Sequence, residues 1–201
     1  MSDLSLLMDP PLGDPPVVMT ADFSSWPDRA AGLGEIRDGA MRLCAPAGIA
    51  RTQTITDQTF RDVIVEALVS SAGRGVGGII VRHEDADGWI GFSIGSGARM
   101  EIAAMIGGDH TVLAGGALVT PFDEVGWNLL SVVALGPSLT FLVNREVVTA
   151  LTLPVGRSGG MVGVHVRGSV EAPDAPSDPD GPDVASVACR WLQVRAVLPV
   201  S

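Results

Sequence analysis

Three observations predict that this chain is all-β, with an antiparallel sandwich or barrel architecture. Short runs rich in Val, Ile and Leu follow one another along most of the sequence. Gly- and Asp-rich turns separate these runs, and no segment between them has the period of a helix. Strand runs that recur about every 8–12 residues are typical of sandwiches and barrels. The length of 201 residues suits one such domain.

The first segment, residues 1–20, is expected to be an extended arm rather than a helix. Two Pro-Pro pairs favour a polyproline-like backbone there. Leu4, Leu6 and Leu7 make the segment too apolar for a solvated tail. We therefore expect the arm to pack on its own domain or on a partner.

From Gly39 onward the sequence predicts one strand after another. Within Phe60–Val69, every second residue from Val63 onward is apolar, and the residues between them form a second set that includes acidic side chains. This period of two is the pattern of a strand with two distinct faces. A turn between Leu142 and Val147 is predicted to be a tight hairpin, because Asn144 tolerates a left-handed backbone. One short helical turn is expected near Pro121–Val125. The remaining predicted strands are 39–44, 76–83, 88–95, 99–105, 111–119, 127–135, 138–144, 146–151, 161–167 and 184–197.

An acidic, Pro-rich loop at 171–183 separates the last two predicted strands. Proline and like-charge repulsion keep such a segment out of a core, so we expect a solvated insertion in a sandwich of residues 21–198. Asp178, Asp180 and Asp183, with Asp174 before them, are weak calcium candidates, because prolines interrupt the spacing of a calcium loop. We expect no cofactor, with calcium at these residues as the alternative.

The charge balance excludes some partners. The formal net charge of −10 argues against nucleic acid and against anionic membrane surfaces, which both select for basic patches. No apolar run is long enough to span a membrane, and no signal peptide is visible. If the sequence is complete as written, we expect a cytoplasmic protein, with peripheral attachment to a membrane complex as an alternative.

The order of the elements resembles the concanavalin A-like lectin/glucanase jelly roll, especially bacterial laminin G-like domains related to 3-keto-disaccharide hydrolases. The resemblance covers roughly residues 21–196 and implies a two-sheet β-sandwich. Arg145 departs from it, because the family usually has Gly after the hairpin Asn. The matching pieces are Asp22-Phe23 with Trp26, Asp38–Leu43, Phe60–Glu66, Gly77–Arg82, Trp89–Ile94, Trp127–Val132, Phe141–Asn144, Gly160–Val164 and Cys189–Val194.

The two cysteines, Cys44 and Cys189, allow two interpretations. They are either separate buried thiols or a disulfide that ties the first predicted strand to the last. Because the resemblance implies that these strands are neighbours, a Cys44–Cys189 contact is geometrically plausible.

Candidate binding residues lie on the predicted strands. Leu192 and Val194 are expected to face the core, which leaves Trp191 facing outward, towards a ligand, a partner or the N-terminal arm. Arg82, Arg99 and Glu101 are candidates for lining a concave sheet, and the other interpretation, which the sequence favours, is that they are ordinary solvated strand positions.

No catalytic residue is marked by the sequence. A retaining glucanase needs two nearby carboxylates, which alternating acidic residues on one strand would supply, and no strand carries such a run. The three histidines lie on separate elements, so no metal site is expected.

We therefore predict a protein without enzymatic activity. It is interpreted as a recognition module, an accessory subunit that docks on a larger protein assembly through its arm and sandwich face. The alternatives are a lectin-like carbohydrate-binding module and a glycoside hydrolase-like enzyme.

Overall fold

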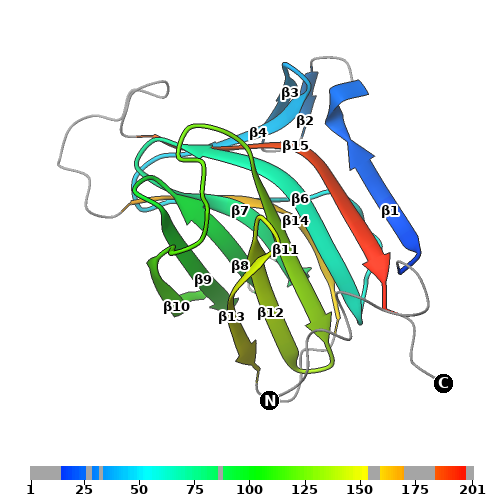
Figure 1. The fold of residues 1–201 in the computed structure, drawn as a ribbon. Coiled ribbons are helices and arrows are strands. Elements are labelled where there is room, and N and C mark those ends of the chain that lie inside the picture. The colour runs from blue at the N-terminus through cyan, green and yellow to red at the C-terminus, as the bar shows by residue number, and fades with distance from the viewer. Residues whose placement is uncertain are drawn as a thin grey trace.

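The computed structural model describes residues 15–25, 29–31, 34–85, 88–153, 159–169 and 184–197. Over these residues the protein consists of two antiparallel sheets packed face to face (Figure 1). A short 3-10 turn, η1 (Phe23–Ser25), interrupts the strands. The predicted all-β sandwich is confirmed. Within the described ranges, no helix is long and apolar enough to cross a membrane.

The larger sheet has nine strands and the smaller sheet has six. In spatial order, the nine-stranded sheet contains β13 (Glu146–Thr152), β12 (Ser138–Val143), β11 (Asn128–Leu135), β6 (Val63–Ala72), β15 (Ala185–Ala196), β4 (Ala40–Ala45), β3 (Gly34–Arg37) and β2 (Arg29–Ala31), with β1 (Val17–Asp22) paired to β15. The six-stranded sheet contains β10 (Asp109–Ala117), β9 (Arg99–Ile106), β8 (Gly88–Gly95), β7 (Gly75–Asp85), β14 (Met161–Gly168) and β5 (Ala50–Thr54).

The core lies between the two sheets and follows the alternation of the sequence. In β6 every second residue from Val63 to Val69 is buried, and the residues between them are only partly covered. Phe92 of the smaller sheet and Phe141 of the larger sheet meet with ring centroids 5.2 Å apart. This alternation fixes which side chains of the larger sheet remain on its outer face.

The last strand, β15, organises the larger sheet. It pairs with β6 along most of its length, while its first half pairs with β4 and its second half with β1. Figure 1 shows β1 running beside β15 at the edge of the molecule. Strand β1 begins at Val17, so the sheet starts within the segment that the sequence assigned to the arm.

Of the two interpretations of the cysteines, the structure agrees with separate thiols and not with a disulfide, although only Cys189 is buried. The predicted neighbourhood of the strands that carry them is correct. Cys44 of β4 pairs with Ser186, and Cys189 of β15 pairs with Met41. Cys44 is exposed on the outer face, whereas Cys189 is fully buried in the core, and no bond joins them. Adjacent strands thus place the two thiols on opposite faces of the sheet.

Four strands were not predicted: β1, β2, β3 and β5. Strand β5, with the sequence ARTQT, is polar and only partly buried at every position, so it carries no alternation. The helical turn expected near Pro121–Val125 is absent. There the Asp123 carboxylate accepts hydrogen bonds from the amides of Val125 and Gly126, which closes a local turn instead.

Candidate functional site

A groove of about 670 Å³ lies on the outer face of the nine-stranded sheet. Its floor is formed by alternate residues of β6, β11, β12 and β15 that point away from the core, and β1 contributes to its wall. A volume of this size falls within the usual range for small-molecule sites. The lining residues are Pro15, Thr20, Asp22, Ile64, Glu66, Leu129, Ser131, Val133, Leu142, Arg145, Trp191, Gln193 and Arg195.

A row of polar side chains crosses this floor. Strand pairing places Thr20 beside Gln193 and Gln193 beside Glu66, and Ser131 follows on the next strand. The Gln193 amide donates a hydrogen bond to Thr20 Oγ1 at 3.3 Å. Because neighbouring strands lie about 4.8 Å apart, this polar row presents donors and acceptors at regular intervals across the groove.

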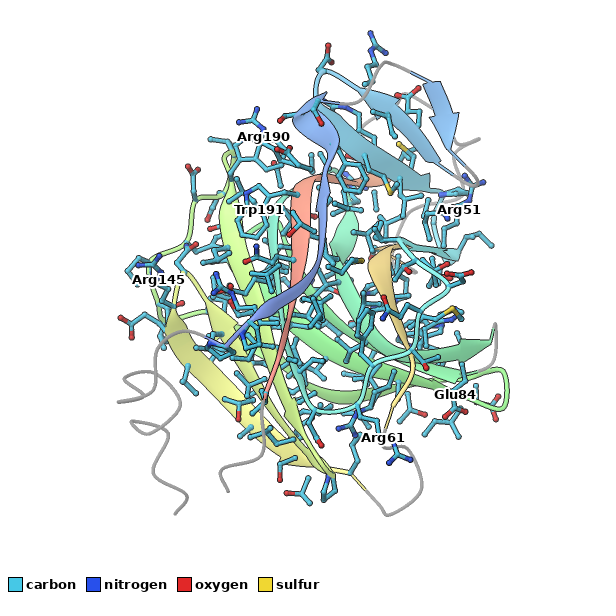
Figure 2. All side chains as sticks on the ribbon, turned by 90° about the vertical axis from the view of Figure 1, so that its right-hand side faces the viewer. Arg51, Arg61, Glu84, Arg145, Arg190 and Trp191 are labelled. Atoms are coloured by element: carbon cyan, nitrogen blue, oxygen red, sulfur yellow. The ribbon has the colours of Figure 1, made fainter. Side chains whose placement is uncertain are left out.

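Trp191 lies in the groove, next to Asp22 in the pairing of β15 with β1. Leu192 and Val194 are fully buried in the core, as expected, and this alternation turns Trp191 to the outer face. Its indole is only partly covered. Figure 2 shows Trp191 on the same side of the molecule as β1. An indole face beside carboxylate and amide groups suits a ligand with both apolar and hydroxyl-bearing surfaces.

The charged groups of the groove are partly neutralised. The hydroxyl and the amide of Ser24 donate to Asp22 Oδ1 at 2.6 and 3.0 Å, and these hydrogen bonds lower the pKa of Asp22. Arg190 lowers it further by charge attraction. Glu66 Oε2 lies 3.2 Å from Nε of Arg195. Each of the two groove carboxylates therefore has a positively charged neighbour, Arg190 for Asp22 and Arg195 for Glu66.

One end of the groove is shaped by the β12–β13 hairpin. Asn144 and Arg145 both have left-handed backbones, with φ of 49° and 72°, so the predicted hairpin and its Asn are confirmed. Asn144 Oδ1 accepts from the amide of Leu129, and its Nδ2 donates to the Pro121 carbonyl and to Asn128 Oδ1. These hydrogen bonds hold the turn, and with it Arg145, at the groove.

The other sequence candidates do not join Trp191. Arg82, Arg99 and Glu101 all belong to the six-stranded sheet. Arg82 is buried and donates to the carbonyl of Gly136. Arg99 is exposed at the start of β9. Glu101 is paired with Arg167.

The outer face of the six-stranded sheet carries a compact cluster that sequence reasoning missed. The Ser93 hydroxyl is hydrogen-bonded to Nε2 of His165, and the Trp89 ring lies 5.1 Å from the His165 ring. The His110 ring centroid lies 6.2 Å from that of Trp89, and its Nε2 lies 3.7 Å from Oε1 of Glu101. Trp89 and Ser93 lie on the same face of β8, and strand order and register bring His165 of β14, His110 of β10 and Glu101 of β9 to them. Ser93, Trp89 and His165 are almost completely buried.

Several predicted residues lie outside the described residues. They are the arm leucines Leu4, Leu6 and Leu7 and the calcium candidates Asp178, Asp180 and Asp183. Among the residues that the structure does describe, no group of three or more His, Cys, Asp or Glu side chains is arranged to hold a metal ion.

No protein-family model and no curated protein matches the sequence. Solved structures do match the fold. The carbohydrate-binding module CBM66 from Bacillus subtilis is 15% identical, covers 86% of this chain and 94% of its own, and has a TM-score of 0.57. The Crh5 transglycosylase is 17% identical, with coverages of 90% and 85% and a TM-score of 0.61. The catalytic domain of an endo-1,3-β-glucanase from Thermotoga petrophila is 10% identical, with coverages of 90% and 97% and a TM-score of 0.58.

These likenesses establish the fold. The chain has the concanavalin A-like jelly roll that carbohydrate-binding modules and glycoside hydrolases also have, as the resemblance implied. The narrower relation to 3-keto-disaccharide hydrolases stays a prediction.

The comparisons correct the prediction of a protein without enzymatic activity. The solved structures that share the fold are mostly glycoside hydrolases, together with a transglycosylase and a carbohydrate-binding module. The prediction depended on the lack of two acidic residues on one strand. That argument considers one strand at a time, whereas Asp22 of β1 and Glu66 of β6 come from different strands and both line the groove.

Proposed function

We propose that this protein binds carbohydrate in the groove on the outer face of its nine-stranded sheet. The observation that carries the proposal is the position of Trp191 beside the polar row of Thr20, Gln193, Glu66 and Ser131. The indole supplies an apolar surface, and the polar row supplies hydrogen bonds for sugar hydroxyls. The likeness of the fold to a carbohydrate-binding module and to several glycoside hydrolases adds support by analogy.

Docking on a protein assembly has less support than carbohydrate binding. That interpretation depended on Leu4, Leu6 and Leu7 of the arm, which lie outside the described residues. The groove, in contrast, is built entirely from described residues whose register follows from strand pairing.

A glycan array with the whole protein tests the proposal, followed by titration of the best ligand with Trp191→Ala. Loss of a ligand-contacting aromatic should weaken binding about tenfold or more. Trp127→Ala is the matched control, because Trp127 carries Arg190 over its ring at 4.7 Å and does not line the groove.

Two results would overturn the proposal. One is an array without any bound glycan, and the other is equal affinity of the Trp191→Ala and Trp127→Ala variants. Release of reducing ends from a bound glycan would instead extend the proposal from binding to hydrolysis. Asp22 and Glu66 would then be the carboxylates to substitute first.

A further inference from the structure

Arg145 occupies a backbone conformation that a side chain disfavours. Its φ of 72° follows the φ of 49° of Asn144, so both central residues of the two-residue hairpin are left-handed. Glycine adopts this conformation freely, whereas other residues lose about 1–2 kcal/mol there. Residues kept in such conformations tend to be found at functional sites. The hydrogen bonds of Asn144 to Leu129, Pro121 and Asn128 leave the turn no easy alternative.

Arg145 is also the one groove charge that the described part of the chain leaves uncompensated. Arg195 is paired with Glu66, and Asp22 is hydrogen-bonded by Ser24 and attracted by Arg190. Arg145 forms no ion pair with any described residue, and its side chain is exposed. In Figure 2 it extends from the margin of the face that carries Trp191.

We infer that the carbohydrate bound in the groove carries an anionic group, a uronate carboxylate or a sulfate ester, and that Arg145 recognises this group. The inference rests on the proposed function. A guanidinium presents a planar fork of donors that matches a carboxylate or sulfate with two parallel hydrogen bonds. Trp191 and the polar row then hold the neutral part of the ligand.

The net charge of −10 does not oppose this inference. Charges separated by more than about 8 Å are largely screened at physiological ionic strength, so remote acidic residues contribute little at the groove. Locally, Asp22 and Glu66 are each matched by an arginine, and Arg145 adds a positive charge.

The test uses an array in which each neutral glycan is printed beside its uronate and its sulfated counterpart. Wild-type protein is expected to bind one of the two anionic forms more tightly than the neutral form. The form that it binds more tightly shows whether the recognised group is a carboxylate or a sulfate ester. Arg145→Gln should weaken binding of that form roughly 10- to 100-fold and leave the neutral form unchanged. Arg99→Gln, an exposed arginine of the opposite sheet, is the control.

Arg145→Gly provides a second measurement, because it separates the stability of the turn from the binding of the anionic group. If Arg145 had only a structural role, a more stable turn would not come with weaker binding. Glycine relieves the left-handed backbone, so this variant should melt about 2 °C higher or more while binding the anionic glycan as weakly as Arg145→Gln. A lower melting temperature for Arg145→Gly would overturn the assignment of strain to this residue.

The remaining outcomes separate this inference from the proposed function. Tight binding of neutral glycans that Arg145→Gln does not change would overturn the inference and leave the proposed function standing. An array without any bound glycan would overturn both. Equal losses with Arg145→Gln and Arg99→Gln would show a general charge effect and would also overturn the inference.

Discussion

At the scale of single residues, the imidazole of His165 shows how strand register can bury a titratable group. It lies between Trp89 and Ser93 on the outer face of the six-stranded sheet, and its ring is almost fully buried. Burial is the largest cause that lowers its pKa to about 3, and the nearby charges of His110 and Arg167 contribute to the same shift. The folded protein therefore holds His165 neutral well below the pH at which a free imidazole becomes charged.

This burial predicts a pH-dependent stability. The unfolded chain takes up a proton at His165 near pH 6.5, whereas the folded chain does so only near pH 3. Unfolding is therefore favoured progressively as the pH falls through this window, and the group has no effect above pH 6.5. The full loss is on the order of 5 kcal/mol, because one pKa unit corresponds to about 1.4 kcal/mol.

Denaturant unfolding between pH 7.5 and 4 measures this effect. His165→Gln keeps a polar group near Ser93 but cannot titrate, so its stability should fall less with pH than that of the wild type. His83→Gln is the comparison at a histidine of the neighbouring strand. A pH profile of His165→Gln parallel to that of the wild type would contradict the assignment.

At the scale of elements, close packing of β7 on its neighbours depends on Gly77 and Gly78. A Cβ on Gly78 would lie 2.0 Å from the Phe92 carbonyl oxygen, and one on Gly77 would lie 2.5 Å from Cβ of Val187. Glycine permits this close approach because it carries no side chain. The first contact involves backbone of β8, which cannot move without breaking the sheet.

Gly78→Ala should therefore destabilise the protein by about 3 kcal/mol or more. Gly115→Ala is the control on β10, since its Cβ would lie 3.3 Å from its nearest neighbour, the Met100 carbonyl oxygen. We expect that control to change stability by at most about 1 kcal/mol. Chemical denaturation of the two variants compares them, and equal losses would contradict the packing argument.

Prediction of elements from the sequence succeeded where burial produces alternation. Strands β6 to β15 were expected close to their observed positions because most of them bury one face or both. Strand β1 was missed because it has a single neighbour, and most of its residues are exposed. Backbone pairing stabilises such a strand, and backbone pairing leaves no pattern of apolar side chains.

At the scale of the whole molecule, the two thiols report on the integrity of the sandwich. Cys44 is exposed on the outer face, and Cys189 is enclosed between the sheets, where burial raises the pKa of its thiol. A thiol reagent acts on an accessible thiolate. Cys189 should therefore react only when the two sheets separate.

Titration with a chromogenic disulfide reagent checks this expectation. One thiol per molecule should react in the native protein without prior reduction, and a second only in denaturant. Cys44→Ser should leave no fast-reacting thiol, and Cys189→Ala should leave one. Absence of reactive thiols in the unreduced native protein would show a disulfide and contradict the register of β4 with β15.

The sequence by itself determined the class of fold, the face of most strands and the outward direction of Trp191. These properties follow from local alternation, which is set by whether each side chain is buried. The tertiary structure alone decided that Trp191 shares a groove with Asp22, Glu66 and Arg145 rather than with Arg82, Arg99 and Glu101. It also decided that Cys44 and Cys189 lie on opposite faces. Strand order and register bring distant residues together through backbone hydrogen bonds. Every residue except proline can form these hydrogen bonds, so the type of side chain does not reveal which strands pair.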